Sequence, residues 1–376
     1  MSKFLVVSDP PVKPGYLPRL RYLCEYLVRK GHDVTLVTEQ TGDLNFPHTY
    51  PIVPIKLYNG SKFDWFVKTV WTLLTDWYNR AFAKKTLYTL HITHYTFDLV
   101  LCTTFNDSPL GAAQRIAKAW GIPLVCDIRD LDEQVEDSRY QYRHRSPLLM
   151  PFRRLYRAVH IRRRNKVLRA ANAVTTVSKW HAEFIRQFNP IVHVVYNGFD
   201  EKQFYPEDIK TERFTVTYIG SLFEWQQPAL EKIKSSISNL QYPIVLDLHT
   251  PQHDPIPFDE LGDAIRRSSI MVVLTDTRTH GMLTTKFYEA LGCGKPVLCV
   301  PSDRGELAEL IEYTHAGIAA DDPETINAFI EEKYKEWKTN GYTRQVTTHR
   351  NIFSRENQSE QMEEIIITII GTKGQQ

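Results

Sequence analysis

The stretch from Gly281 to Val300, GMLTTKFYEALGCGKPVLCV, combines residue types that could bind a phosphorylated ligand. Thr284 begins a helical pattern, and the first turn of a helix presents free backbone N–H groups and a partial positive charge to an anion. Lys286 in that turn is unfavourable for the helix dipole, so a bound anion would compensate for it. Glu289 follows one turn later, where its carboxylate could accept hydrogen bonds from the two hydroxyl groups of a ribose.

The same residues also fit a purely structural interpretation. Lys286 could lie in solvent and pair with Glu289 at i, i+3, and these residues alone leave the two interpretations about even. Gly281 would let the chain approach a ligand closely. The preceding His280 fits a sugar contact and a solvated loop position equally well.

The surrounding sequence predicts the elements that would position this stretch. Short apolar runs rich in β-branched residues alternate with segments of helical periodicity, a βαβ pattern that implies parallel sheets. We expect strands at 3–8, 32–38, 97–104, 122–130, 173–178, 214–220, 242–250, 269–275 and 295–300.

The strands fall into two series, separated by a polar, charged stretch at 200–213. The sequence therefore predicts an α/β protein with two Rossmann-like, doubly wound parallel-sheet domains that face a cleft. We place the first domain at 1–199 and the second at 200–354, with a C-terminal helix at 355–376 that packs back on the first. Ligands of such sheets bind at the carboxyl ends of the strands, and the cleft between two such domains is the expected site.

Composition narrows the class of protein. The 376 residues are 42% hydrophobic and 24% charged, which is typical of a soluble globular chain, and the net charge is only +2. We therefore expect no nucleic-acid partner. The five cysteines are scattered without a Cys-x-x-Cys pair, which favours buried thiols in a reducing compartment. Without a signal peptide or an apolar run of about 20 residues, a cytoplasmic location is expected.

A strongly basic segment runs from Arg139 to Arg169 without any acidic residue. Phe152, Leu155 and Tyr156 lie on one face of its helical pattern, and arginines lie on the other. A basic amphipathic helix suits an anionic membrane surface, here the inner face, and the aromatic-rich stretch 65–82 would add to that interface. The alternative is a solvated basic face over an ordinary core helix.

Five segments, taken in order, resemble the GT-B glycosyltransferases of family 4. They are KFLVVSDPPVKPGYLPRLRYLCEYLVRKGHDVTLVT, VCDIRDL, AVTTVSKWHAEFI with VVYNGFDEKQFYP, YIGSLFEWQQPAL, and TTKFYEALGCGKPVLCV. The resemblance covers nearly the whole chain. It implies the two-domain fold, and the transfer of a sugar from a nucleotide-diphosphate donor to an acceptor hydroxyl with retention of configuration.

The resemblance also implies roles for individual residues. Asp130, in VCDIRDL, would lie near the acceptor, and Lys286 would stabilise charge on the leaving group, so these two are the expected catalytic residues. The expected donor-binding residues are Gly15, Gly220, Ser221, His280, Gly281, Met282, Leu283, Thr284, Thr285 and Glu289.

This chain departs from the family pattern at three positions. Gly281 stands where the family has the first glutamate of a pair, and Ser221 and Gln226 stand where it often has an arginine and a lysine that hold the diphosphate. Lys286 would then carry that charge. A subgroup of bacterial polysaccharide glycosyltransferases is more similar, with "TK-F-E" at the donor site. It implies a role in surface polysaccharide or glycolipid synthesis, with a glycan or lipid-linked acceptor.

The nucleotide sugar is a substrate in this interpretation, and no metal or other cofactor is expected. Two alternatives remain on the same fold. A nucleotide-sugar epimerase would need the donor alone, and a non-catalytic sugar-nucleotide-binding subunit is favoured by Gly281, Ser221 and Gln226.

Overall fold

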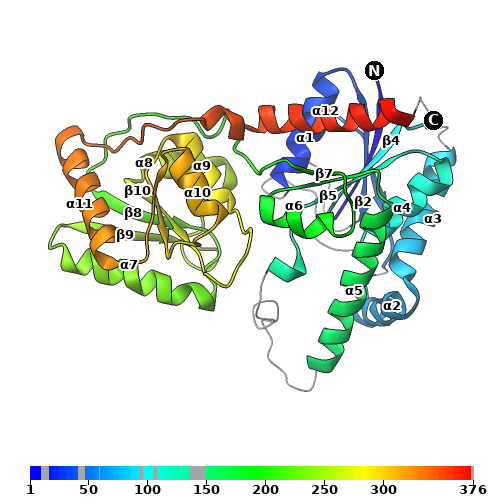
Figure 1. Cartoon of the computed structure of the whole chain (residues 1–376), viewed down its shortest axis with the longest axis horizontal. Coiled ribbons are helices and arrows are strands. Elements are labelled where there is room, and N and C mark those ends of the chain that lie inside the picture. Colours follow the sequence, from blue (N-terminus) through cyan, green and yellow to red (C-terminus); the bar gives the residue numbers. More distant parts are fainter. Residues whose placement is uncertain are drawn as a thin grey trace. The chain divides into compact units, whose positions relative to one another are not determined.

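The computed structural model describes residues 1–9, 17–40, 47–58, 60–92, 96–104, 108–134 and 150–373. They form two α/β units, each built around its own parallel sheet (Figure 1). Unit 1 comprises Met1–Glu133, Tyr142–Tyr196 and Ser359–Gln376, and unit 2 comprises Gln134–Gln141 and Asn197–Gln358. The prediction of two Rossmann-like parallel sheets is confirmed.

The sheet of unit 1 has seven strands in the order β3-β2-β1-β4-β5-β6-β7, and every pair is parallel. Its strands are β1 (Lys3–Ser8), β2 (Asp33–Glu39), β3 (Ile52–Ile55), β4 (Leu99–Thr104), β5 (Leu124–Ile128), β6 (Ala173–Thr176) and β7 (Val192–Val194). Its helices are α1 (Pro18–Arg29), α2 (Lys62–Thr75), α3 (Trp77–Ile92), α4 (Leu110–Trp120), α5 (Met150–Ala170), α6 (Lys179–Arg186) and α12 (Arg355–Lys373), with a short 3-10 turn η1 (Asp132–Gln134).

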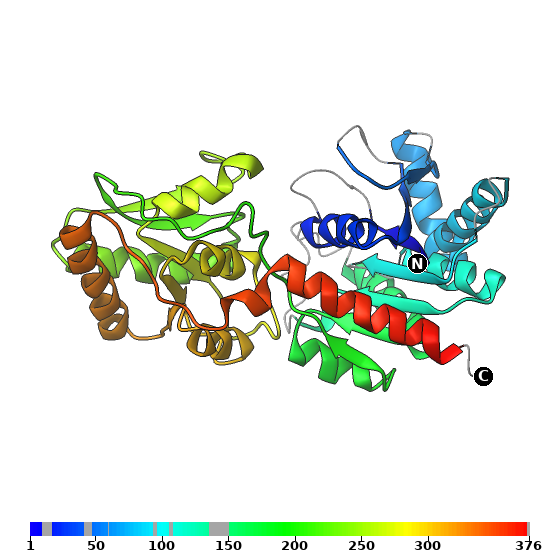
Figure 2. The same cartoon turned by 90° about the horizontal axis from the view of Figure 1, so that it is seen from above.

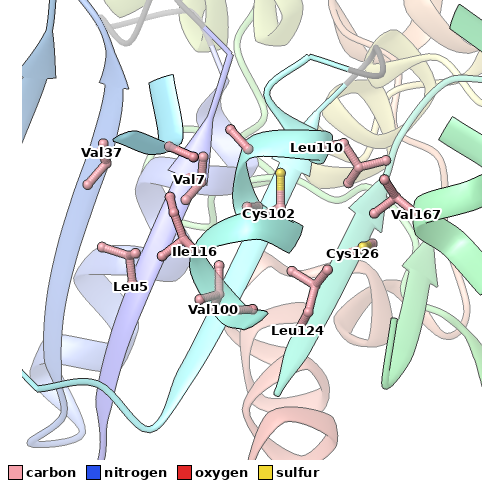
Figure 3. Close-up of a cluster of buried hydrophobic side chains, with 14 of the residues drawn as sticks. Leu5, Val7, Val37, Val100, Cys102, Leu110, Ile116, Leu124, Cys126 and Val167 are labelled. Atoms are coloured by element: carbon pink, nitrogen blue, oxygen red, sulfur yellow. The ribbon is translucent and has the colours of Figure 1, made fainter. Parts of the chain in front are cut away.

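Both faces of this sheet are buried, which explains why its central strands are continuous apolar runs. Leu5 and Val7 of β1 point into a core shared with α3, α4, α5 and α6, part of which Figure 3 shows. Phe4 and Val6 point to the opposite face, where α1 and α12 cover the sheet.

Helix α12 lies beside α1 in both views (Figures 1 and 2). Met362 and Ile366 are buried in the core that α1 contributes to. Glu363 accepts a hydrogen bond from the Tyr26 hydroxyl at 2.9 Å and lies 2.8 Å from Nε2 of His32. The last helix of the chain is thereby attached to the first unit.

The sheet of unit 2 has five parallel strands in the order β12-β11-β10-β8-β9. They are β8 (Phe214–Ile219), β9 (Ile244–His249), β10 (Ile270–Leu274), β11 (Val297–Val300) and β12 (Gly317–Ala319). The helices are α7 (Gln227–Asn239), α8 (Leu261–Arg267), α9 (Thr285–Cys293), α10 (Glu306–Tyr313) and α11 (Pro323–Asn340), with 3-10 turns η4 (Glu224–Gln226), η5 (Phe258–Glu260) and η6 (Arg350–Phe353).

The basic segment differs from its predicted form. The residues from Arg139 to 149 lie outside the described part of the chain, and α5 begins at Met150. Arg164 is buried within it and pairs with Glu133 at 2.7 Å. The expected separation into one apolar and one arginine-bearing face is therefore incomplete.

All five cysteines are buried and unpaired, as predicted for thiols. None of the described helices is both long enough and apolar enough to cross a membrane.

Candidate functional site

The switch point of the second sheet lies at β8. From this strand the chain moves to β9 on one side and then to β10 on the other. At such a point the loops after neighbouring strands diverge and leave room for a ligand at their carboxyl ends. Gly220 directly follows β8, and the segment from Thr275 to Thr284 joins β10 to α9. Most of the predicted donor-binding residues belong to these two loops.

The turn after β8 is fastened to β10 by the buried side chain of Gln226. Its Nε2 donates to the Leu274 carbonyl at 3.0 Å, and its Oε1 accepts from the backbone N–H of Phe223 at 2.9 Å. The Tyr218 hydroxyl donates to the Ser221 carbonyl at 2.6 Å. Gln226 therefore shapes the turn, because its amide is used within the protein and does not extend toward a ligand.

Helix α9 begins next to this turn. Thr284 is its N-cap, with extended backbone angles and a side chain that accepts from the backbone N–H of Lys286 at 3.4 Å. Gly281 has a φ of +61°, in the left-handed region that glycine adopts readily. Leu283 is buried, His280 and Met282 are partly buried, and Thr285 is exposed.

The side chain of Lys286 reaches back from α9 to lie directly over Gly220. A Cβ atom on Gly220 would stand 2.7 Å from Cε and 2.8 Å from Nζ of Lys286. Gly220 also has a φ of +126°, which favours glycine, and any larger residue there would displace the end of the Lys286 side chain. The Nζ atom lies 5.3 Å from the centre of the Tyr218 ring, at cation–π distance. The structure thus brings Gly220 and Lys286 together.

The ammonium group of Lys286 lacks a hydrogen-bond or ion-pair partner among the residues that the structure describes. Lys286 and Glu289 form no ion pair at i, i+3, although each is near enough for its charge to act on the other. Burial lowers the pKa of Lys286, although the nearby charge of Glu289 acts in the opposite direction. A partly buried ammonium without an anionic partner favours the binding of an anion.

Glu289 lies one turn into α9 and is partly buried. Burial raises the pKa of its carboxyl group, while the charges of Lys286 and Arg355 and a hydrogen bond from Thr285 act in the opposite direction. The carboxylate and the ammonium therefore share one partly buried region of unit 2. This arrangement provides one hydrogen-bond acceptor and one cation for a ligand at the start of α9.

Two of the predicted site residues do not belong to this group. Asp130 follows β5 in unit 1 and is partly buried. Gly15 lies outside the described residues.

Unit 1 has its own charged cluster at the carboxyl end of its sheet, which sequence reasoning identified only in part. Asp127 accepts hydrogen bonds from Arg19 at 3.2 and 3.4 Å, from Thr103 at 3.0 Å and from Thr175 at 2.8 Å. Burial favours the neutral acid, but Arg19, Arg129 and these hydrogen bonds hold the pKa of Asp127 below its usual range. Arg19 was missed, although an arginine in the first turn of a helix is an unusual choice that could have indicated a carboxylate partner.

Arg19 also connects this cluster to Tyr196, where the chain leaves unit 1. Its Nη1 donates to the Tyr196 carbonyl at 2.6 Å. The cluster thus fixes where α1 begins, directly after the segment that contains Gly15. Asp127 is accordingly a buried ion-pair partner that holds Arg19 in place. Within the described part of the chain, no group of three or more His, Cys, Asp or Glu side chains could hold a metal ion.

Solved structures share this architecture over almost their whole length. Sucrose-phosphate synthase from Thermosynechococcus elongatus is 14% identical, with a TM-score of 0.62 over 99% of this chain and 100% of that one. Anabaena HepE, in complex with UDP and glucose, is 14% identical, with a TM-score of 0.64 over 98% and 100%. Starch synthase IV from Arabidopsis thaliana is 13% identical, with a TM-score of 0.57 over 98% and 99%. No curated protein matches the chain by sequence at a significant level.

These similarities, with the two parallel sheets, define the chain as a protein of the GT-B fold. Residues 19–203 match the family model described as Glycosyltransferase Family 4. The chain therefore has the GT-B fold, and residues 19–203 of it match this glycosyltransferase family.

Proposed function

We propose that this chain transfers a sugar, with retention of anomeric configuration, from a nucleotide-diphosphate donor to an acceptor hydroxyl. The observation that carries the proposal is the ammonium of Lys286, held over Gly220 at the switch point of unit 2. A diphosphate placed there would meet this cation and the positive end of the α9 dipole. Glu289, one turn deeper, would accept hydrogen bonds from the ribose hydroxyls.

The names of similar structures support a nucleotide-sugar donor. HepE was solved with UDP-glucose, MnaA of S. aureus with UDP, and starch synthase IV with ADP and acarbose. We assign the position of Gly281, where the family has a glutamate, to the neighbourhood of the donor sugar.

The proposed transfer takes place on one face of the sugar. The bond from C1 to the diphosphate oxygen breaks, the bond from C1 to the acceptor oxygen forms on the same face, and the acceptor proton passes to the departing diphosphate. Lys286 stabilises the negative charge that grows on this leaving group. The rest of the contribution is positioning, for which we assign Asp130 to the acceptor. We propose that the reaction needs no metal or other cofactor, because Lys286 and the positive end of the α9 dipole neutralise the diphosphate.

We further propose that the acceptor is a glycan or a lipid-linked sugar, and that the reaction serves bacterial surface polysaccharide or glycolipid synthesis at the inner face of the membrane. The support is the similarity of TTKFYE and the Ser221–Gln226 turn to bacterial polysaccharide glycosyltransferases.

The test incubates the protein with UDP-, GDP-, ADP- and dTDP-sugars, with and without acceptor glycans. We expect one donor to raise the unfolding temperature, because a ligand that binds only the folded state stabilises it. We also expect release of its nucleotide only when an acceptor is present, and a product with the donor's anomeric configuration by NMR. Isomerised donor without acceptor would indicate an epimerase instead, and binding without turnover would indicate a binding subunit.

A further inference from the structure

Strand β9 carries an ion-paired histidine at its carboxyl end. The strand lies at the edge of the second sheet and pairs with β8 (Figure 1). His249 is its last residue, and only 15% of its side chain is exposed. Its backbone carbonyl accepts a hydrogen bond at 2.8 Å from the N–H of Gly220, the residue over which Lys286 lies. The histidine therefore adjoins the turn that we assign to the donor.

Both ring nitrogens of His249 face oxygen atoms of acidic residues. Nε2 lies 3.0 Å from Oδ2 of Asp247, which belongs to the same strand. Nδ1 lies 2.9 Å from Oδ2 of Asp254 and 3.0 Å from its backbone carbonyl oxygen. Carboxylate and carbonyl oxygens only accept hydrogen bonds, and a neutral imidazole has a single N–H to donate. The doubly protonated imidazolium is therefore the form that satisfies both sides of the ring at once.

The charges around the ring favour the same form. Burial disfavours the charged imidazolium, but the hydrogen bonds and negative charges of Asp247 and Asp254 outweigh it and raise the pKa of His249 above its ordinary value. The neighbouring strand adds no charge, because β8 places Ile219 opposite His249 and Thr217 opposite Asp247. The two carboxylates are thus the charges that set the protonation of this ring.

The ion pair holds the turn after β9 against the strand. Thr250 and His253 exchange backbone hydrogen bonds of 2.8 and 3.0 Å, so the turn is closed within itself. Asp254 follows with a φ of +50°, in the left-handed region that residues other than glycine adopt uncommonly. Its side chain is 71% exposed, whereas Asp247 is fixed by the pairing of β9 with β8. The contact with Asp254 is therefore the one that gives way when the ring loses a proton.

We propose that His249 is a pH-sensitive latch, which holds the turn at 250–254 against the end of β9 while its ring is doubly protonated. When the ring loses a proton to solvent, one nitrogen presents a lone pair to a carboxylate oxygen, and the turn separates from the strand. The latch is a property of folded unit 2 and does not depend on the proposed sugar transfer. Because it adjoins Gly220, its state changes how firmly the edge of the candidate donor site is held.

The first measurement is an NMR titration of the imidazole C–H resonance of His249 in the full chain, without ligand. The resonance is identified by its absence in His249→Gln. We expect the midpoint to lie above the ordinary value of 6.5. It should fall in both Asp247→Asn and Asp254→Asn, because each variant loses one negative charge beside the ring.

The second measurement is hydrogen exchange of the backbone N–H groups of residues 250 and 253, corrected for the direct effect of pH on exchange. Stability that comes from a raised pKa is fully present below the pKa of the open turn and is lost as the pH rises through that of the closed turn. Protection should therefore decline between about pH 6 and about pH 9, by about tenfold for each pH unit that separates these two values.

Two variants and a matched control test the role of the titrating charge. His249→Arg should keep the turn protected throughout, because a guanidinium stays charged over this range and has several N–H donors. Asp254→Asn should reduce the decline together with the midpoint, because the pH sensitivity needs this carboxylate. The control is His253→Gln, which alters an exposed histidine of the same turn whose ring lies outside the ion pair. It should behave like the unaltered protein.

Several results would overturn the latch. They are a midpoint for His249 at or below 6.5, a midpoint that Asp254→Asn leaves unchanged, and equal protection of the turn at both ends of the pH range. A decline that persists in His249→Arg, or one that disappears in His253→Gln, would do the same. If the arginine variant does not fold, Asp254→Asn gives the decision, because a decline of full size in that variant contradicts the proposal.

Discussion

Replacing Lys286 with methionine isolates the charge that we assign to the leaving group. Methionine keeps an unbranched apolar stem over Gly220 and beside the Tyr218 ring, so packing at the turn is preserved. The Nζ atom lacks a hydrogen-bond partner in the described part of the protein, so no internal donor or acceptor is left unsatisfied. The variant should therefore fold normally and lose one positive charge.

The expected loss is larger in the chemical step than in donor binding. Removing one preorganised group that stabilises developing charge lowers kcat by roughly 10²–10³. That is about 2.7–4 kcal/mol at 1.36 kcal/mol for each tenfold change. The diphosphate is already charged in the ground state, so donor affinity should also fall, by about tenfold. The difference arises because negative charge on the diphosphate grows as the sugar leaves.

The assay follows nucleotide release at saturating donor and acceptor, and calorimetry measures donor affinity. Lys232→Met is the matched control, because this exposed lysine on α7 donates only weakly to the Asp321 carbonyl, at 3.3 Å. A Lys286→Met variant that keeps kcat within about threefold of the unaltered protein would refute the assignment and place the charge on another cation.

The pH dependence gives an independent check on Lys286. Burial lowers its pKa in the free protein, and in the proposed mechanism the diphosphate binds its charged form. Donor affinity should therefore be highest below this lowered pKa and decline as the pH rises through it toward 10.5, the ordinary value. The decline should be missing in Lys286→Met, and a decline of equal size there would contradict the reasoning.

Three further changes test other parts of the structure. Glu289→Gln should weaken binding of the free nucleotide by about 1–3 kcal/mol in calorimetry, since a charged hydrogen-bond acceptor for the ribose is lost; unchanged affinity would contradict it. Asp127→Asn should lower the free energy of unfolding by roughly 3–5 kcal/mol in urea, because Arg19 stays buried without its counter-charge. The depressed pKa of Asp127 contributes stability that is lost as the pH falls through that pKa, so the variant should be less sensitive to acid. Burial lowers the pKa of Lys295 to about 8. The unfolded chain therefore binds more protons at this group between about pH 8 and 10.5, so the free energy of unfolding should rise with pH across that range. In urea titrations the Lys295→Met variant should lack this rise.

The sheets were predictable because their signal is local. The central strands are buried on both faces and therefore read as continuous apolar runs, as in the FLVV of β1. The edge strands β3, β7 and β12 were missed. They have only four, three and three residues, and Pro54 and Gly317 interrupt the patterns of β3 and β12.

The candidate site was predictable only where its parts lie close in sequence. The start of α9 was found from its threonines and its position after a strand. The contact between Gly220 and Lys286, and the pairing of Arg19 with Asp127, join residues far apart in the chain. Such contacts depend on how strands are ordered in the sheet, which no local pattern encodes.

Contacts at the C-terminal end of α9 hold the helix in place and so fix the position of Lys286 in its first turn. Arg350 donates to the Gly292 carbonyl at 2.8 Å, and a Cβ atom on Gly292 would lie 2.7 Å from the ring of Phe199, so the helix packs too tightly there to shift. Lys295, buried just beyond the helix, donates to the Thr343 carbonyl at 3.1 Å. A group that stabilises charge in a transition state acts best when its position is fixed before the reaction begins. In the proposed mechanism, the glycines and the lysine of GCGKP would therefore act indirectly, by fixing the helix whose first turn presents Lys286.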